Sequence, residues 1–479
     1  MNKVSFVFND QIQEIDFANS PYTPTTSVLK YLRSLNGHKG VKEGCGEGDC
    51  GACTLVLAEL NGDGLRYKAV DSCLVFLPMI HGKQLITVEN LADAKGDLHP
   101  VQQAMIDLYA SQCGYCTPGF VMSLFALYKS PVKPVNEVIL DSITGNLCRC
   151  TGYLPIIEAA AKACSKKEKD IFSIREKQTI NLLKQINNQD VIVITTPKQK
   201  YYKPFKLTDV LELKRKHPDA LIISGNTDTG LRVSKKHELL TEIIDISAVE
   251  ELKSITETKQ SLSIGAGVSM EEVKLATEKL FPALHKMLSV FGSKQIRNLA
   301  TIGGNIGSAS PIGDTLPVLM ACNAVVALSS HNDSRVLGIQ DFIKGYRTTD
   351  LRKDEIICSI GIPFPEKDQI IKSYKISKRK DLDISTCSAG FMLELNKNDH
   401  TVKNIILAYG GMAALTRRAT KTEEFLAGKK WSRTTVEKAA AILYQEFTPL
   451  SDARSGEEFR RLAARNLLWK FYEETTSKK

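Results

Sequence analysis

Two clusters of cysteine constrain this chain more than any other feature of its sequence. Eight of the 12 cysteines lie within the first 150 residues, in two groups of four. The first group is Cys45, Cys50, Cys53 and Cys73, and the second is Cys113, Cys116, Cys148 and Cys150. Thiols spaced this closely need loops that gather them at one point, so the N-terminal part must fold around two such points.

The first group has the spacing of a plant-type 2Fe-2S ferredoxin loop. Four residues separate Cys45 from Cys50, two separate Cys50 from Cys53, and Cys73 follows a predicted strand. Glycines fill the loop between these cysteines, and they let backbone N–H groups approach the sulfurs of a compact anionic cluster without a Cβ in the way. These glycines are Gly44, Gly46, Gly48 and Gly51. The loop therefore predicts a 2Fe-2S cluster.

The second group consists of a Cys-x-x-Cys pair and a Cys-x-Cys pair, separated by a helical pattern. Taken alone it fits zinc as well as iron, because tetrahedral sulfur sites suit both metals. Beside a ferredoxin loop we interpret it as a second 2Fe-2S cluster, with zinc as the alternative. A disulfide framework has little weight, because the N-terminus alternates like a strand and lacks the apolar core of a signal peptide.

Composition places the chain among globular proteins of several domains. It has 479 residues, of which 43% are hydrophobic and 24% charged, and this length predicts two to four domains. We expect a cytoplasmic protein, where thiols stay reduced and free to bind metal, with no membrane span. The formal charge of +9 would fall to roughly +5 if two oxidised clusters each carried about −2, so we expect no nucleic-acid partner.

The pattern of the first 165 residues predicts two small domains. Short strands, including one at 73–78, and a helix around 27–34 form a β-grasp-like pattern up to about residue 90. Four short helices follow, starting near Pro100, Pro118, Asn136 and Tyr153. Cys116 and Cys150 each lie just before one of these helices, whose free N–H groups and partial positive charge would favour an anionic cluster.

The second half alternates strands and helices and contains two glycine-rich loops. A buried strand at 220–223 runs into Gly225-Asn-Thr-Asp-Thr-Gly230, and Gly303-Gly-Asn305 follows about 75 residues later. Neither matches a Rossmann fingerprint or a P-loop. Together, and flanked by Ser, Thr and Asn donors, they predict a dinucleotide held between two lobes. We interpret the Gly265-Ala-Gly267 turn as structural. A last helix is expected to carry a Ser455 to Glu458 capping box and an apolar face at Phe459, Leu462, Ala463 and Leu467.

These motifs resemble the molybdenum hydroxylase family, and within it the xanthine dehydrogenases. The resemblance rests on the Cys45–Cys53 loop, on Gln112-Cys-Gly-Tyr-Cys-Thr-Pro-Gly119, on Gly145-Asn-Leu-Cys-Arg-Cys-Thr-Gly-Tyr153 and on both glycine loops. It covers nearly all of the chain. The order of modules is similar to the small subunit of the two-subunit bacterial enzymes.

The resemblance implies FAD in the second half of the chain. It assigns cofactor contacts to Ile222, Ile223, Ser224, Gly225, Asn226, Thr227, Asp228, Thr229, Phe291, Thr301, Ile302, Gly303, Gly304, Asn305, Asp314, Ile357 and Lys375. From sequence alone, Asp314 could equally be a turn residue and Lys375 a surface lysine. The family also places the loop Lys378-Arg-Lys-Asp381 near the flavin, where its charge could tune the flavin and the approach of a nicotinamide.

The implied function is electron exit. In the family a molybdenum-pterin centre hydroxylates a purine, and electrons pass through the clusters to FAD and then to NAD⁺, with oxygen as another acceptor. No stretch of this sequence remains for the molybdenum domains, so we expect a large molybdenum-cofactor-binding partner subunit, in a heterotetramer or larger assembly. Gln112 and Cys150 would face the pterin. No catalytic residue is expected in this chain.

We therefore predict a multidomain α+β protein. Its parts are a β-grasp 2Fe-2S ferredoxin domain at 1–90, a four-helix-bundle 2Fe-2S domain at 91–165, a linker at 166–198, a two-lobed α+β FAD-binding domain at 199–367, and an α+β C-terminal domain at 368–479. Two alternatives stay open. One is the same subunit of a hydroxylase for aldehydes or other N-heterocycles, and the other is a non-catalytic electron-transfer or zinc-binding protein.

Four cysteines remain outside the two groups. They are Cys164, Cys322, Cys358 and Cys387, and each has apolar or small neighbours in sequence. We expect these thiols to pack in cores rather than to bind metal.

Overall fold

The computed structural model describes residues 2–93, 95–186 and 189–476. The chain forms two compact units, which we describe separately. Unit 1 comprises Met1–Leu213, Asp219–Val249 and Gly292–Ala300. Unit 2 comprises Lys214–Pro218, Glu250–Phe291 and Thr301–Lys479.

Unit 1 begins with a five-stranded sheet in the order β2-β1-β5-β3-β4. The strands are β1 (Lys3–Phe8), β2 (Gln11–Asp16), β3 (Thr54–Asn61), β4 (Gly64–Asp71) and β5 (Gln84–Ile86). β1 and β5 run parallel, and the other neighbours are antiparallel. Helix α1 (Val28–Ser34) contributes to the core on one face, as the β-grasp prediction requires.

Strand β3 is buried on both faces because its side chains alternate between two cores. Leu55 and Leu57 belong to the core that includes α1. Val56 and Ala58 point to the opposite face and belong to the core of the helical bundle. Successive residues of a strand face opposite sides, so this single apolar strand joins the ferredoxin-like sheet to the bundle.

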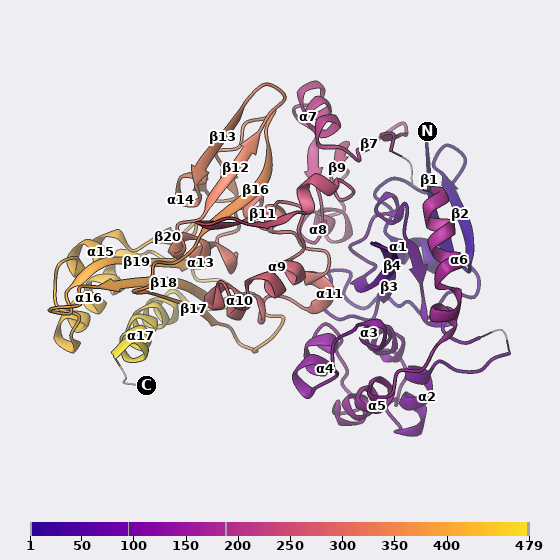
Figure 1. Cartoon of the computed structure of the whole chain (residues 1–479), viewed down its shortest axis with the longest axis horizontal. Coiled ribbons are helices and arrows are strands. Elements are labelled where there is room, and N and C mark those ends of the chain that lie inside the picture. Colours follow the sequence, from indigo (N-terminus) through magenta and orange to yellow (C-terminus); the bar gives the residue numbers. More distant parts are fainter. Residues whose placement is uncertain (1, 94, 187–188, 477–479) are drawn as a thin grey trace. The chain divides into compact units, whose positions relative to one another are not determined.

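The four predicted helices are present. They are α2 (Pro100–Asp107), α3 (Thr117–Lys129), α4 (Asn136–Ile143) and α5 (Leu154–Ser165), grouped together in Figure 1. α3 is almost entirely buried, which fits its run of apolar residues. α4 begins at Asn136, as expected, and Val135 occupies its N-cap.

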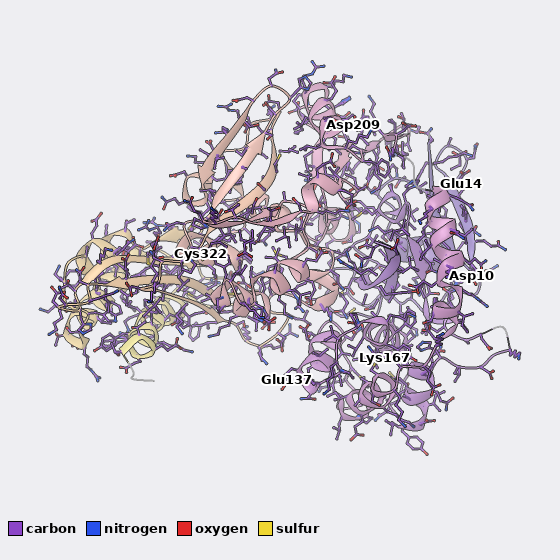
Figure 2. The ribbon with its side chains drawn as sticks, viewed as in Figure 1. Asp10, Glu14, Glu137, Lys167, Asp209 and Cys322 are labelled. Atoms are coloured by element: carbon purple, nitrogen blue, oxygen red, sulfur yellow. The ribbon has the colours of Figure 1, made fainter. Side chains whose placement is uncertain are left out.

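The segment predicted as a linker, 166–198, contains a packed helix. Helix α6 (Ile171–Ile186) buries four side chains, and it lies alongside the first sheet in Figure 1. Leu183 and Ile186 pack on Val7 of β1. Arg175 of α6 also forms an ion pair with Asp10, which is labelled in Figure 2. The polar composition that suggested a linker is the outer face of this amphipathic helix; residues 187 and 188 lie outside the described part.

The predicted strand at 73–78 is wrong. Leu74 to Leu77 are fully buried, but the segment is a turn followed by the short helix η1 (Leu77–Ile80). The Leu77 N–H donates to the Thr26 carbonyl, and Pro78 has no N–H to donate to a ladder. A short apolar run fits a buried loop as well as a strand, and periodicity cannot separate the two.

A second, four-stranded sheet of unit 1 continues the ferredoxin-side core. Its order is β6-β7-β9-β8, with β6 (Ile192–Thr195), β7 (Lys200–Lys203), β8 (Leu221–Ile223) and β9 (Glu242–Asp245). Ile194, Tyr201 and Ile243 share one apolar core with the strands around α1. β8, which leads into the first glycine-rich loop, is therefore fixed to the cluster-bearing part of unit 1. It is an edge strand, and Leu221 and Ile222 are only half-buried.

Unit 2 holds two larger sheets and a small two-stranded sheet of β14 (Ile343–Gly345) and β15 (Thr348–Thr349). The first has the order β10-β11-β16-β12-β13, and the second has the order β17-β18-β19-β20. The strands are β10 (Ile255–Glu257), β11 (Ser261–Gly265), β12 (Val325–Ser329), β13 (Ser334–Gly338), β16 (Ile356–Pro363), β17 (Gln369–Ile376), β18 (Cys387–Leu395), β19 (Val402–Gly410) and β20 (Arg417–Arg418). Helix α13 (Thr315–Ala321) is buried throughout and packs on β18 and β19. Cys322, labelled in Figure 2, follows it in the interior, where burial raises its pKa to about 12.

The second sheet of unit 2 is covered by the C-terminal helices α15 (Thr420–Leu426), α16 (Arg433–Glu446) and α17 (Glu457–Thr476). The predicted capping box of the last helix is wrong, because the Glu457 N–H donates to Ser451 Oγ at 3.0 Å instead. Ala463 and Leu467 are buried as expected, whereas Phe459 and Leu462 are 51% and 38% exposed, so half of the predicted apolar face is wrong. None of the helices in the described residues has the length and apolar character needed to cross a membrane.

His81 predicts a pH dependence of stability in unit 1. Burial, assisted by the nearby Lys203 ammonium, lowers its pKa to about 4, and the Ser5 N–H donates to its Nδ1 at 3.1 Å. The unfolded chain takes up the proton at about pH 6.5, so the stabilising contribution is complete above that pH and is lost as the pH falls towards 4. The full effect is about 3 kcal/mol.

The substitution His81→Gln keeps an acceptor for Ser5 and removes the titration. Urea unfolding between pH 7 and pH 4 should then show a shallower loss of stability than the wild type. Equal slopes for the two proteins would contradict this assignment.

Candidate functional site: two thiol quartets and a flavin cradle

The ferredoxin-type loop is shaped by left-handed glycines. Gly46, Gly48 and Gly51 have φ values of 67°, 78° and 65°, which L-residues with a Cβ rarely adopt. The resulting coil aims the N–H groups of Glu47 and Asp49 at Cys45 Sγ, at 3.4 and 3.3 Å. The predicted crowding of N–H groups around sulfur is therefore present.

These contacts favour a thiolate at Cys45. A hydrogen bond from the Cys50 thiol, followed by those backbone N–H groups, lowers the pKa of Cys45 to about 5. The thiolate is the form that binds metal. The loop is thus electrostatically prepared for an anionic sulfur site.

The eight thiols meet in pairs. Hydrogen-bond contacts join Cys45 with Cys50, Cys53 with Cys73, Cys113 with Cys150, and Cys116 with Cys148. Within the described residues, no three His, Cys, Asp or Glu side chains converge on a point where one metal ion could sit. A two-iron cluster needs four thiolates shared between two irons, whereas a Cys₄ zinc site needs all four on one ion. Two pairs of thiols in each quartet match a two-iron cluster in which each iron takes two thiolates.

The second quartet sits at the ends of two bundle helices. Cys116 is the N-cap of α3, and Cys150 precedes Leu154, the first residue of α5, by four positions. Thr151 Oγ1 donates to Cys148 Sγ at 3.2 Å, and the Cys148 N–H donates to Tyr153 Oη at 2.9 Å. The predicted placement of these thiols near helix N-termini agrees with the structure.

The two cysteine loops touch each other through backbone. The Leu147 N–H donates to the Cys50 carbonyl at 3.1 Å, directly linking residues beside both quartets. A Cβ at Gly51 would lie 2.2 Å from the Gly145 carbonyl oxygen, and one at Gly119 would lie 2.2 Å from the Gly51 carbonyl oxygen. Glycine is needed at positions 51 and 119 for this approach, because a larger residue at either position would separate these segments. A Cβ at Gly145 would instead lie 2.2 Å from Gln295 Oε1.

The first glycine-rich loop of the flavin cradle lies in unit 1, against the ferredoxin-type loop. A Cβ at Gly225 would fall 1.8 Å from the Leu299 carbonyl oxygen. Asn226 has φ 59°, and its Nδ2 donates to the Leu74 carbonyl at 2.8 Å. Leu74 follows Cys73, so this loop touches the neighbour of a cluster thiol. Asn226 Oδ1 is buried and accepts no hydrogen bond from any residue that the structure describes, which fits a donor supplied by a bound cofactor.

The second glycine-rich segment is a helix start, not a turn leaving a strand. Residues Ile302–Gly307 form helix α12, capped by Thr301, whose Oγ1 accepts from the Gly304 N–H at 3.2 Å. A Cβ at Gly303 would lie 2.5 Å from Ala266 Cβ, so the Gly265–Gly267 turn supports this helix. The turn is structural, as predicted.

Predicted flavin contacts in unit 2 are brought together around Asp314. Lys375 Nζ lies 2.8 Å from Asp314 Oδ2 and 2.9 Å from the Val290 carbonyl oxygen, next to Phe291. Ser385 Oγ donates to the other Asp314 oxygen at 2.5 Å. The Lys375 side chain is only 5% exposed, so the surface-lysine interpretation is wrong.

Asn305 and Ile357 complete this group. Asn305 Oδ1 accepts from Thr315 Oγ1 at 2.5 Å, which places it beside Asp314. Ile357 Cδ1 lies 3.3 Å from the Cβ position of Gly307 in α12. The remaining predicted contacts, from Ile222 to Thr229, belong to unit 1.

Sequence reasoning missed a set of buried polar residues near the thiols. Gln295 and Arg297, both in helix α11 (Lys294–Arg297), are completely buried, and Asn146 is 2% exposed. Gln295 and Asn146 hydrogen-bond to each other across 149 positions of sequence. Asn146 lies in the Gly145–Tyr153 motif, but nothing in that motif indicates that its partner is Gln295, because the contact forms only in the folded protein.

Four family profiles match successive parts of the chain. They are described as a 2Fe-2S iron-sulfur cluster binding domain over residues 17–77, a 2Fe-2S binding domain over 87–161, an FAD binding domain in molybdopterin dehydrogenase over 196–365, and a CO dehydrogenase flavoprotein C-terminal domain over 372–475. Together they follow the two thiol quartets, the flavin cradle and the C-terminal sheet in order.

Curated relatives include enzymes with different substrates in their names. The chain is 31% identical to xanthine dehydrogenase of Oryza sativa subsp. japonica, over 93% of this chain and 38% of that protein. It is 30% identical to aldehyde oxidase 3 of Mus musculus, over 94% of this chain and 38% of that protein. The chain thus spans less than two fifths of the length of these relatives.

Solved structures share the fold of a little over half of the chain. A carbon monoxide dehydrogenase from Hydrogenophaga pseudoflava matches with a TM-score of 0.54 and 22% identity, over 58% of this chain and 96% of that chain. Quinoline 2-oxidoreductase from Pseudomonas putida 86 matches with a TM-score of 0.53 and 24% identity, over 58% and 97%.

The chain belongs to the molybdenum hydroxylase family. It carries the 2Fe-2S-binding and FAD-binding domains of that family, and the predicted multidomain α+β fold is confirmed. The ligand roles of individual cysteines and flavin contacts stay predictions, which the geometry above supports.

For this molybdenum hydroxylase chain, Gly225→Ala tests the flavin cradle. The new Cβ would overlap the Leu299 carbonyl, so the loop must shift and FAD occupancy should fall severalfold while iron content is kept. The flavin absorbance of the purified protein measures FAD occupancy, and metal analysis measures its iron content. Gly456→Ala is the control, because a Cβ there meets nothing within 4 Å. Full FAD occupancy in the Gly225 variant would contradict the assignment.

Proposed function

We propose that this chain is the electron-exit subunit of a xanthine dehydrogenase. It receives electrons from a molybdenum-pterin centre on a large partner subunit and passes them through two 2Fe-2S clusters to FAD and then to NAD⁺. The clusters exchange single electrons, and a flavin converts two of them into one hydride. We place the complex in the cytoplasm, with hypoxanthine and xanthine as substrates and urate as product.

A difference in exposure between the two quartets is the observation that carries this proposal. Cys113 and Cys150 are exposed to solvent. Cys53 and Cys73 are 2% and 4% exposed, under the loop that carries Asn226. An electron entering at the exposed quartet would therefore leave through the buried one, towards the flavin.

Contacts on the exit side support this direction. Asn226 bonds the Leu74 carbonyl, and Lys235, which follows helix α8 (Gly230–Ser234), donates to the Cys45 carbonyl at 3.1 Å. Lys235 also lies 3.5 Å from Glu47. The segment that would hold the dinucleotide is thus bonded to the ferredoxin-type loop at two places.

Exposed apolar side chains around the second quartet support a partner at the entry side. Tyr115, between Cys113 and Cys116, is 48% exposed, and Leu154, just after Cys150, is 61% exposed. An apolar cavity of about 400 Å³ opens beside the same loop, lined by Ser111, Thr117 and neighbouring residues of α2 and α3. Apolar surface next to an exposed redox centre suits the large subunit whose pterin would face Gln112 and Cys150.

NAD⁺ as acceptor and xanthine as substrate rest on the family resemblance and on the relatives named xanthine dehydrogenase. The charged loop Lys378-Arg-Lys-Asp381 is our candidate for tuning nicotinamide approach; Arg379 in it is held by Asp383 at 2.6 Å. The similar identity to an aldehyde oxidase favours, as second candidate, the same electron-exit role in a complex that oxidises aldehydes or N-heterocycles.

The decisive experiment is copurification with the large subunit encoded by the same organism, followed by an assay with NAD⁺. NADH formation with xanthine, and none with aldehydes, supports the first proposal. NADH formation only with aldehydes or other heterocycles replaces xanthine by the second candidate. A purified complex that contains zinc and no flavin would overturn both.

Cysteine variants test the two clusters separately. Cys116→Ser and Cys73→Ser should each remove one of two electron paramagnetic resonance (EPR) signals of the dithionite-reduced protein, because each thiol serves a different quartet. Cys358→Ser, outside both quartets, is the control and should keep both signals. Loss of both signals from the control, or of neither from the other two variants, would contradict the assignment.

A further inference from the structure

Gln295 lies at the centre of a buried polar network in unit 1. Its side chain is completely buried. Its Nε2 is within hydrogen-bond distance of Ser123 Oγ at 2.8 Å, Asn146 Oδ1 at 3.0 Å and the Ser142 carbonyl at 3.3 Å. These partners come from α3, from α4 and from the loop that leads to Cys148, so one amide links three segments of the bundle.

Asn146 extends the network to the ferredoxin-type loop. Its Nδ2 donates to the Gly51 carbonyl and to Thr54 Oγ1, both at 3.1 Å. Gly51 immediately follows Cys50, and Asn146 lies two residues before Cys148. The Asn146 side chain therefore touches the backbone of one thiol loop while belonging to the other.

Arg297 fixes the helix that presents Gln295. Its guanidinium is fully buried and lies 2.6 Å from Asp141 of α4. Asn298, the next residue, donates to the Ala69 carbonyl of β4 at 2.9 Å. Helix α11 is thereby tied to both the bundle and the first sheet, and Gln295 has little freedom to move.

Buried polar groups are costly unless they are paired, and here the Gln295 amide nitrogen has partners while its Oε1 has none within the described residues. The paired groups favour one arrangement of the segments that they join. An apolar residue in place of Gln295 would fill the same space, but it would not favour one arrangement of the joined segments over another. The direct loop contact, Leu147 N–H to the Cys50 carbonyl, lies next to the residues that the network holds. The network is thus placed to set the spacing of the two quartets.

We propose that Gln295 is a positioning residue of the electron relay. Through Asn146 it holds the two thiol loops, and hence the two clusters, at one fixed separation. This inference rests on the proposed function. In the step concerned, the reduced cluster of the bundle loses one electron and the oxidised cluster of the ferredoxin-type loop gains it; no covalent bond changes and no proton moves.

The test compares Gln295→Met with the wild type and with Lys294→Met. Methionine keeps the volume of Gln295 and removes its amide, and Lys294 is the half-exposed neighbour outside the network. Both clusters are reduced with dithionite, and the splitting that each EPR signal acquires from the other cluster is recorded. The rate of electron transfer between the clusters is measured by flash reduction.

We expect Gln295→Met to lose or broaden this splitting and to slow transfer severalfold, with iron content unchanged. Lys294→Met should behave like the wild type. Ser123→Ala is a milder variant that removes only one hydroxyl of the network, and it should change the splitting partly. If Gln295→Met does not fold, the EPR splitting and the electron-transfer rate of Ser123→Ala test the inference instead.

Unchanged splitting and rate in the decisive variant would overturn the inference, even if thermal stability fell, because stability alone would then be the role of the network. That result would leave the proposed function intact. A wild-type protein without two reduced-cluster signals would instead overturn the proposed function, and this inference with it.

Discussion

Close backbone contact between the two cysteine loops is the constraint on which the rest of unit 1 depends. The contact needs glycine at positions 51 and 119, because a Cβ at either of them would overlap backbone. It also needs the hydrogen bond from Leu147 to the Cys50 carbonyl. Once the loops meet, the sheet and the helical bundle must share β3, whose alternating side chains fill both cores.

The same unit carries the first glycine-rich loop, which contacts the residue after Cys73. Two thiols of one quartet, Cys113 and Cys150, are exposed, whereas Cys73 of the other quartet is buried next to Leu74, whose carbonyl accepts from Asn226. Anionic iron-sulfur clusters would be stabilised by positive charge or by N–H donors. The loop N–H groups, the start of α3 and Lys235 provide these. The loop N–H groups and the start of α3 come from local backbone geometry, whereas Lys235 reaches the Cys45 carbonyl through its side chain from a distant part of the sequence.

Sequence predicted those parts whose information is local. Cysteine spacing, glycine content and prolines at helix starts located the thiol loops and the four-helix bundle. Three predictions from local sequence patterns were wrong, because packing in the folded protein decides these segments. The apolar run after Cys73 is buried as a loop, the polar segment before residue 187 packs as α6, and Gly303 opens a helix. The roles of Gln295 and Arg297 could not be predicted, because their partners lie about 150 positions away in the sequence.

The central claim is that each thiol quartet holds two irons rather than one metal ion. A Mössbauer spectrum of protein enriched in ⁵⁷Fe tests it most directly. The account predicts about four irons per chain, all ferric and magnetically coupled when oxidised, with half becoming ferrous on full reduction. Uncoupled single irons, or quartets filled by zinc with no iron signal, would contradict it.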